Sequence, residues 1–190
     1  MWTDAEVIAA SLTEADAFEA IFDRHFSAIS RYLRRRLRHP IADELAAEAF
    51  TTAFAGRRSY DLDRPTALPW LYGIAANLVR RHARDEEREL HAYSRTGIDP
   101  VVASDSEPLE RLLRQDLEPR VAQALTDLDP GDREVLLLFA WANLGYEEIG
   151  CALVLPLGTV KSRLNRARGQ VRASLESLFA APTEEEAVNG

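Results

Sequence analysis

The sequence predicts an all-α fold of two helical domains joined by a flexible linker. Apolar residues recur every three or four positions in most of the chain, and the alternating pattern typical of β-strands is missing. Over residues 92–109 this helical periodicity gives way to glycine, prolines and scattered serines and aspartates, a composition typical of linkers. We therefore expect one domain at 1–91, a linker at 92–109, a second domain at 110–180, and an acidic tail at 181–190.

The first domain is expected to contain a short helix followed by long ones, each bounded by a capping or helix-breaking residue. The expected helices cover residues 4–10, 14–38 and 41–55, and a further stretch that follows Thr66. Thr13 and Thr66 are suitable N-caps because their hydroxyls can accept a hydrogen bond from a free backbone N–H. Pro40 and Gly56 are expected to end the helices that precede them.

The second domain ends in two short helices separated by a tight break. Residues 146–153 form the first helix, Pro156 interrupts the chain, and Thr159 is expected to cap the second helix. The apolar stripe of the second helix consists of Val160, Leu164, Ala167 and Val171. An earlier helix is expected to begin at Asp129-Pro130, a cap followed by a first-turn proline, and to run to about Ala142.

The face opposite this stripe is polar and basic. Ser162, Asn165 and Arg166 lie on it at about 100° per residue, and Lys161 and Arg163 flank it. No Asp or Glu occurs between residues 157 and 172, although the formal charge of the chain is −8. A short helix, a tight turn and a basic second helix are typical of a helix-turn-helix, whose second helix enters the DNA major groove. An ordinary amphipathic helix with a solvated basic face is the alternative.

Composition limits the remaining possibilities. The pI of about 5.1 argues against a protein that coats nucleic acid without selectivity, but a clustered basic face is compatible with site-specific DNA binding. Cys151 is the only cysteine, so an internal disulfide is impossible. The sequence shows no signal peptide and no apolar run of membrane-spanning length, and we expect a cytoplasmic protein without membrane insertion.

Two motifs in this order identify a family. WLYGIAANLVRRH (70–82) and YEEIGCALVLPLGTVKSRLNRAR (146–168) make the stretch 17–178 resemble the extracytoplasmic-function (ECF) group of bacterial RNA polymerase sigma factors, in the sigma-70 family. ELAAEAF (44–50) resembles the polymerase-binding helix of this family. The chain departs from the family pattern at Ala47, where glutamine is common, and at Gly145, where the cap is usually serine or threonine.

The resemblance implies a non-catalytic initiation factor whose partners are core RNA polymerase, promoter DNA and an anti-sigma factor. It also implies association with the nucleoid when the protein is in the holoenzyme. The first domain, region 2, would bind polymerase and open the minus-ten element, and the second, region 4, would bind the minus-thirty-five element. The implied polymerase contacts are Glu44, Leu45, Glu48 and Phe50, of which Leu45 and Phe50 are expected to turn inward.

The implied minus-ten residues are Tyr60, Trp70, Asn77, Arg80, Arg81 and Arg84, and Trp70 also fits a role in core packing. The implied minus-thirty-five residues are Thr159, Lys161, Ser162, Arg163, Asn165, Arg166 and Arg168. Lys161 and Arg166 can donate to guanine O6 and N7, whereas Ser162 and Asn165 can bond other base edges. Arg163 and Arg168 are expected to contact phosphates.

Two other classes of protein remain as alternatives. A stand-alone helix-turn-helix transcriptional regulator explains the second domain, but gives no role to the motifs in the first. A helical metal-dependent hydrolase would need paired ligands, and the four histidines show no HExxH-type spacing. We therefore expect no catalytic residues, no metal and no cofactor.

Overall fold

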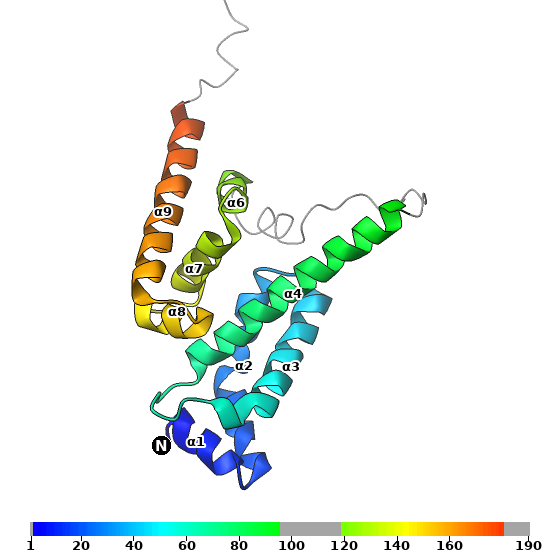
Figure 1. The fold of residues 1–190 in the computed structure, drawn as a ribbon, viewed down its shortest axis with the longest axis vertical. Coiled ribbons are helices and arrows are strands. Elements are labelled where there is room, and N and C mark those ends of the chain that lie inside the picture. The colour runs from blue at the N-terminus through cyan, green and yellow to red at the C-terminus, as the bar shows by residue number, and fades with distance from the viewer. Residues whose placement is uncertain (1, 96–118, 181–190) are drawn as a thin grey trace, which may run out of the picture.

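The computed structural model describes residues 2–95 and 119–180, and these form helices without any strand. The first domain contains α1 (Asp4–Ser11), α2 (Glu19–Arg34), α3 (His39–Gly56) and α4 (Leu68–Arg95), with 3₁₀ turns at Ala15–Phe18 and Arg57–Ser59. The second contains α6 (Pro119–Thr126), α7 (Pro130–Trp141), α8 (Tyr146–Leu153) and α9 (Leu157–Ala180) (Figure 1). The all-α prediction is confirmed. The expected tail, and the expected linker from residue 96 onward, lie outside the described residues.

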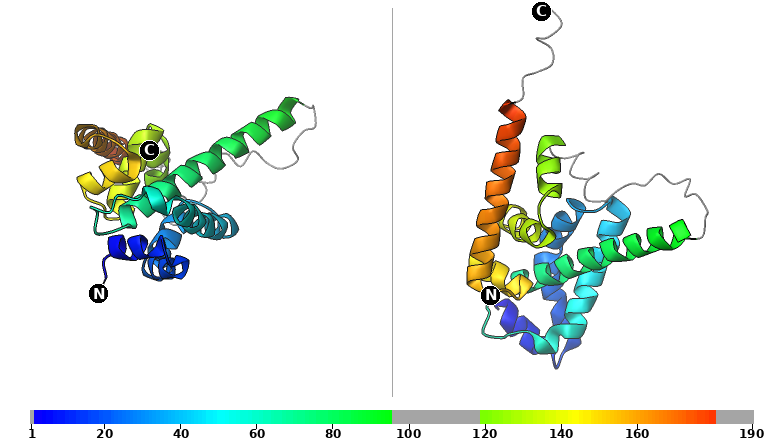
Figure 2. Two further views of the ribbon diagram at one scale, coloured as in Figure 1. Left: turned by 60° about the horizontal axis from the view of Figure 1, so that its bottom comes forward. Right: turned by 45° about the horizontal axis from the view of Figure 1, so that its top comes forward.

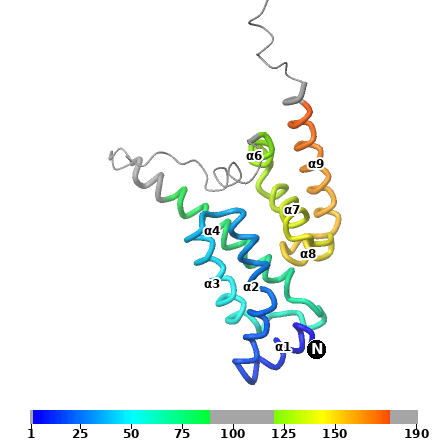
Figure 3. The backbone as a smooth tube through the Cα atoms, turned by 180° about the vertical axis from the view of Figure 1, so that it is seen from behind, coloured from blue at the N-terminus to red at the C-terminus, as the bar shows by residue number. Residues whose placement is uncertain are grey.

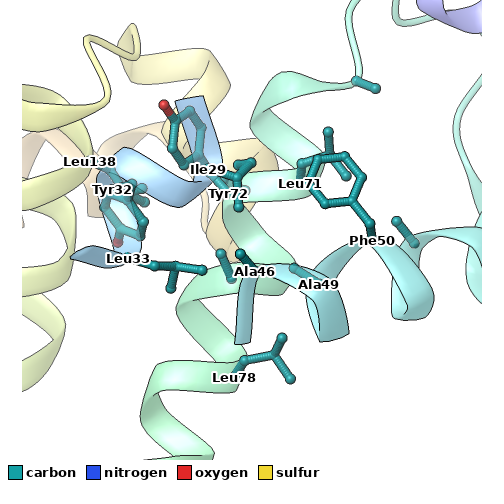
Figure 4. Close-up of a cluster of buried hydrophobic side chains, with 14 of the residues drawn as sticks. Ile29, Tyr32, Leu33, Ala46, Ala49, Phe50, Leu71, Tyr72, Leu78 and Leu138 are labelled. Carbon is teal, nitrogen blue, oxygen red and sulfur yellow. The ribbon is translucent and has the colours of Figure 1, made fainter. Parts of the chain in front are cut away.

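The core of the first domain lies between α2, α3 and α4. Ile29 and Leu33 of α2, Ala46 and Ala49 of α3, and Leu71 of α4 are completely buried. The small alanine side chains let α3 approach its neighbours closely. Figure 4 shows these side chains in one cluster, which also contains Leu138 from α7. The apolar core therefore continues from the first domain into the second.

The start of α2 differs from the sequence prediction. The Thr13 hydroxyl donates to the carbonyl oxygen of Ala10 at 3.0 Å, so it closes the end of α1 and does not cap the next helix. A 3₁₀ turn over Ala15–Phe18 then precedes α2, and Phe18 is buried. The predicted cap at Thr13 is wrong because α2 begins only at Glu19, beyond the 3₁₀ turn.

The boundary between α2 and α3 also differs. The helix ends at Arg34, and the following turn carries Arg36 and Leu37 into the interior, where each is less than 5% exposed. Pro40 does not end a helix; it lies in the first turn of α3, where the missing N–H is not needed for helical hydrogen bonding.

The third long helix, α4, extends further than predicted. Its start agrees with the sequence, since the Thr66 hydroxyl accepts a hydrogen bond from the Leu68 N–H at 3.4 Å. Its end at Arg95 lies beyond the expected start of the linker at residue 92. The ion pair of Arg88 with Asp85, one turn apart, favours helix in this charged stretch.

Asp4 fixes α1 to the rest of the first domain. Its buried carboxylate accepts hydrogen bonds from Arg24 (2.9 Å) and from the Ala67 N–H (2.8 Å), and it contacts His25 Nε2 at 2.7 Å. Burial alone would raise the pKa of Asp4, but these contacts together lower it below its usual value. One carboxylate thus joins the start of α1, the middle of α2 and the turn before α4.

The second domain has a small core of its own and also packs against the first. Its core residues are Ala122, Leu125, Leu128, Leu137 and Ala167, from α6, α7, α9 and the turn after α6. Asp129 caps α7 as predicted, since its carboxylate accepts the Gly131 N–H at 2.8 Å. Figures 2 and 3 show α8 lying against the N-terminal half of α4, where the two domains meet.

Candidate nucleic-acid interface

The helix-turn-helix forms as the sequence predicts. After α8, Val154 adopts a left-handed conformation with φ of 54°, and Pro156 precedes α9. Val160, Leu164 and Ala167 are buried under α9, whereas Lys161, Ser162 and Asn165 are exposed on its outer face. The exposed face can therefore enter a groove without any change in the packing of the helix.

Thr159 occupies a different position from the one predicted. The helix begins at Leu157, and the carbonyl oxygen of Pro156 accepts the N–H groups of Thr159 (2.9 Å) and Val160 (3.1 Å). Thr159 is therefore a first-turn residue, and the predicted cap is wrong. Its own carbonyl accepts the hydroxyl of Ser162 at 3.0 Å, a bond that Ser162 can exchange for a base or a phosphate.

The arginines of α9 differ in their surroundings. Arg166 donates to both carboxylate oxygens of Asp132 in α7, through Nε at 2.5 Å and Nη2 at 2.9 Å. Arg163 lies against the backbone at Gly131. The Arg168 guanidinium stacks over the ring of Phe139, 4.4 Å from its centroid. Two of these arginines, Arg166 and Arg168, are thus oriented by specific partners within the domain.

The predicted minus-ten residues divide into aromatics, which are buried or partly buried, and exposed polar groups. Tyr60 is buried, donates its hydroxyl to the Arg64 carbonyl at 2.7 Å, and packs against Trp70 with ring centroids 5.1 Å apart. Burial raises the pKa of Tyr60 to about 12. Trp70 is only partly buried. Asn77, Arg80 and Arg84 are exposed on α4, where Arg80 donates to the Asn77 side chain and Arg84 Nε donates to the Arg80 carbonyl at 3.2 Å.

The predicted polymerase-binding helix is α3. Leu45 and Phe50 face the core, as the sequence predicts, whereas Glu44 is exposed and Glu48 is partly exposed. Arg81 of α4 donates to Glu48 at 2.5 Å, so these two predicted contact residues are paired with each other in the free chain. On the exposed side of α3, one of the two glutamates is therefore paired with an arginine of α4, and the other, Glu44, is exposed.

A buried ion pair joins the two domains. Arg36, in the turn after α2, donates to both carboxylate oxygens of Glu134 in α7, at 2.7 and 2.9 Å, and both side chains are 5% exposed. The Tyr32 hydroxyl donates to the same carboxylate at 2.6 Å. Burial alone would raise the pKa of Glu134, but Arg36 and the hydrogen bonds lower it overall. The charge on Glu134 is therefore compensated mainly by Arg36, with a smaller contribution from Arg80 of α4.

Close backbone packing accompanies the ion pair. A Cβ added to Gly73 of α4 would lie 2.2 Å from the carbonyl oxygen of Ala152 in α8, so only glycine fits. Nearby, Arg64 contacts the sulfur of Cys151, which is partly buried between the domains. Arg35 also lies over the ring of Trp141 at 5.8 Å.

Sequence reasoning missed the residues of this contact and the role of Asp132. Arg36 belongs to the basic run RRRLR, and Asp132 and Glu134 belong to the charged run DRE, so each resembles a surface residue. The sequence did contain one signal of the contact between the domains. A glycine inside a helix, such as Gly73, costs about 1 kcal/mol relative to alanine and often marks close backbone packing.

The described residues contain no group of three or more His, Cys, Asp or Glu side chains that could hold a metal ion. Among the helices at 2–95 and 119–180, none is long and apolar enough to cross a membrane.

Comparisons with known proteins agree with this arrangement. The model of sigma-70 region 2 matches residues 21–89, and the model of sigma-70 region 4 matches residues 119–171. The ECF RNA polymerase sigma factor SigW of Bacillus subtilis is 30% identical over 173 residues, which cover 87% of this chain and 92% of SigW. The RNA polymerase sigma factor CarQ of Myxococcus xanthus is 30% identical over 168 residues, covering 86% and 91%.

Solved structures show the same fold. CnrH, in complex with the cytosolic domain of CnrY, is similar with a TM-score of 0.63 and 25% identity, covering 92% of this chain and 97% of CnrH. The sigma factor RpoE of Bartonella quintana, in complex with the anti-sigma factor NepR, gives a TM-score of 0.62 at 22% identity, covering 85% and 98%. The chain therefore belongs to the extracytoplasmic-function group of sigma-70 family RNA polymerase sigma factors, non-catalytic initiation factors that direct core RNA polymerase to promoters.

Proposed function

We propose that α9 binds the minus-thirty-five element through its exposed face, while α3 binds core polymerase and α4 holds the opened minus-ten element. The observation that carries the first assignment is the division of α9 into two faces. Val160, Leu164 and Ala167 of its apolar stripe are buried, and its outer face presents Lys161, Ser162 and Asn165 to solvent in a stretch without acidic residues. Positive charge favours approach to phosphates, and the polar side chains can bond base edges.

Lys161→Ala tests the minus-thirty-five assignment. Loss of a donor to one guanine should cost about 1–3 kcal/mol on the cognate promoter and relax preference at one base pair. The matched control is Arg172→Ala, which removes the same charge from an exposed position 11 residues further along α9. This position lies about 16 Å away along the helix axis, beyond the N-terminal part that contacts bases. Equal losses for both variants on all promoter sequences would show that Lys161 contacts only phosphate.

The polymerase assignment rests on the resemblance of α3 to the polymerase-binding helix of the family and on the exposure of Glu44. Glu44→Lys reverses a charge at an exposed position without disturbing the buried side of the helix. We expect weaker binding to core polymerase, measured by fluorescence anisotropy of the labelled full chain. Glu147→Lys makes the same change at an exposed position of α8 and should leave core binding unchanged. Normal core binding by the Glu44 variant would remove α3 from the proposed interface.

The minus-ten assignment requires a rearrangement of the aromatic residues. Asn77, Arg80 and Arg84 are exposed and can bind an unpaired strand directly, through base edges and phosphates. Tyr60 can stack on a base only after it leaves its hydrogen bond to the Arg64 carbonyl. Asn77→Ala should therefore reduce promoter opening, measured by permanganate reactivity of thymines, more than Tyr60→Phe, which keeps the ring.

An anti-sigma protein is proposed as the third partner. CnrH was solved with the cytosolic domain of CnrY, and RpoE of Bartonella quintana with the anti-sigma factor NepR. We expect a pull-down from the native host to recover such a protein with this chain. With polymerase and promoter DNA as its other partners, the protein would work in the cytoplasm and associate with the nucleoid in the holoenzyme. Free, active protein under all growth conditions would contradict regulation by an anti-sigma factor.

A further inference from the structure

From the ion pair between α7 and α9, we infer that Asp132 is a positioning residue that sets base specificity through Arg166. Its carboxylate holds the guanidinium so that the remaining edge is directed at a guanine of the minus-thirty-five element. The inference rests on the proposed function of α9, and it assigns to α7 a part in sequence recognition.

The two side chains of the Asp132–Arg166 ion pair differ in their exposure to solvent. The Asp132 side chain is 1% exposed, whereas the Arg166 side chain is 57% exposed. Hydrogen bonds from Arg166, and its positive charge, hold the pKa of Asp132 below its usual value, so the carboxylate is ionised at neutral pH. A buried, charged acceptor therefore anchors an arginine whose other side faces solvent.

The donors that remain free match guanine. Asp132 occupies the edge of the guanidinium formed by Nε and Nη2. Both N–H groups of Nη1 and the second N–H of Nη2 stay available, and one N–H of each nitrogen forms the other edge of the planar fork. Guanine presents two acceptors in the major groove, O6 and N7, whereas adenine presents one acceptor and one donor. An edge made only of donors therefore favours guanine over adenine.

The ion pair with Asp132 also keeps Arg166 from contacts with DNA phosphates. A free arginine side chain is flexible and binds phosphates as readily as bases, and phosphate contacts carry no direct sequence information. Holding the side chain before DNA arrives reduces the entropy lost on binding and keeps the fork away from the backbone. The effect of Asp132 should therefore be found in base discrimination and not in overall affinity.

The other charged groups around the pair have separate roles. Arg163 lies near Asp132 from the same helix as Arg166, and Asp129 lies near Arg166. Asp129 is engaged as the cap of α7 through the Gly131 N–H. Removal of the Asp132 charge leaves two arginines close together, which should strengthen non-specific attraction to phosphates.

The test is Asp132→Asn in the full chain with core polymerase, on promoters randomised over the minus-thirty-five element. The matched control is Asp129→Asn, which removes the same charge nearby but keeps an acceptable cap. Wild type and control should prefer guanine at the position that Arg166 contacts. The Asp132 variant should lose on the order of tenfold of that preference while keeping or gaining affinity at low salt. Arg166→Ala should remove the preference at the same position, and the double variant should match Arg166→Ala.

Three results would overturn the inference. The guanine preference could persist in the Asp132 variant while only thermal stability falls, which would make the pair a structural tie. Affinity could rise equally on all promoters while the guanine preference stays intact, which would mean that Asp132 only reduces the positive charge near DNA. The position lost in the Asp132 variant could also differ from the one lost in Arg166→Ala.

One further variant and the behaviour of the wild type keep the outcome interpretable. Should Asp132→Asn fail to fold by circular dichroism, Arg166→Lys tests the same inference, because it keeps the charge but lacks the fork. Because a lysine can itself donate to guanine, this variant should weaken the guanine preference without removing it and should retain affinity, and an unchanged preference would contradict the inference. Failure of wild type to bind core polymerase or to prefer any minus-thirty-five sequence would instead refute the proposed function.

Discussion

Glu134→Ala removes one partner of the ion pair that joins the two domains. In the wild type, both carboxylate oxygens of Glu134 are bonded to Arg36, and the Tyr32 hydroxyl donates to one of them. The variant leaves the Arg36 guanidinium buried beside a tyrosine hydroxyl, with no counter-charge in the contact. Only exposure of Arg36 to water can then restore its solvation, and that requires the second domain to move away from the first.

The expected size of the effect follows from the burial of the pair. Loss of one partner from a buried ion pair costs about 3–5 kcal/mol. At about 1.4 kcal/mol per decade, the equilibrium between docked and separated domains shifts by roughly 100- to 4,000-fold. Helices should survive the separation, because α6, α7 and α9 retain their own core around Leu125, Leu137 and Ala167.

Small-angle X-ray scattering and circular dichroism of the full chain measure the two effects separately. We expect a larger radius of gyration with nearly unchanged helix content. Glu147→Ala, which removes an exposed acidic residue of α8, should change neither quantity. The double variant Arg36→Met with Glu134→Leu should restore docking, since apolar residues of similar volume often replace a buried ion pair without loss.

An unchanged radius of gyration with a single cooperative loss of thermal stability would refute this reasoning. That result would mean that Arg36 and Glu134 belong to one indivisible core, and that the second domain does not separate without unfolding.

Two further predictions concern the same fold. Gly73→Ala should raise the intrinsic helix stability of α4 by about 1 kcal/mol, and hydrogen exchange would detect this. The same variant should undock α8, because the new methyl group overlaps the Ala152 carbonyl oxygen. Scattering would detect the undocking, and an unchanged radius of gyration would contradict it. The lowered pKa of Asp4 predicts that its contribution to the free energy of unfolding is complete above the unfolded pKa of about 3.9 and is lost as pH falls through the folded value. Asp4→Asn should therefore flatten the acid dependence of the melting temperature, and an equally steep dependence in the variant would show that other carboxylates cause it.

Local signals in the sequence predicted much of the fold. The stripe of Val160, Leu164 and Ala167 gave the buried face of α9, and Asp129 gave the start of α7, because both depend only on neighbouring residues. The predicted helix boundaries were wrong where a residue fits two local positions equally well. Thr13 can bond backward to Ala10 as well as forward, and Pro40 is as acceptable in a first turn as after a last one.

The contact between the domains was not predictable in the same way. Helical periodicity shows which side of a helix is apolar, but Arg36 and Glu134 are polar residues separated by 98 positions. Their burial depends on where the second domain docks, and no local window contains that information. Leu45 and Phe50 illustrate the opposite case, since their burial in α3 follows from spacing alone.

The run DRE in α7 shows what cannot be predicted from local sequence. At about 100° per residue, three consecutive side chains must point in three directions. Asp132 meets Arg166 of α9, Arg133 donates to backbone carbonyls at the end of α6 and just beyond it, and Glu134 meets Arg36 of the first domain. Helical geometry predicts that these three side chains point in different directions, but it does not predict which residues they contact. Because Asp132 and Glu134 point about 200° apart, we expect Glu134→Ala to undock the domains without changing the guanine preference assigned to Arg166. A changed preference in that variant would mean that docking and base recognition are coupled through α7.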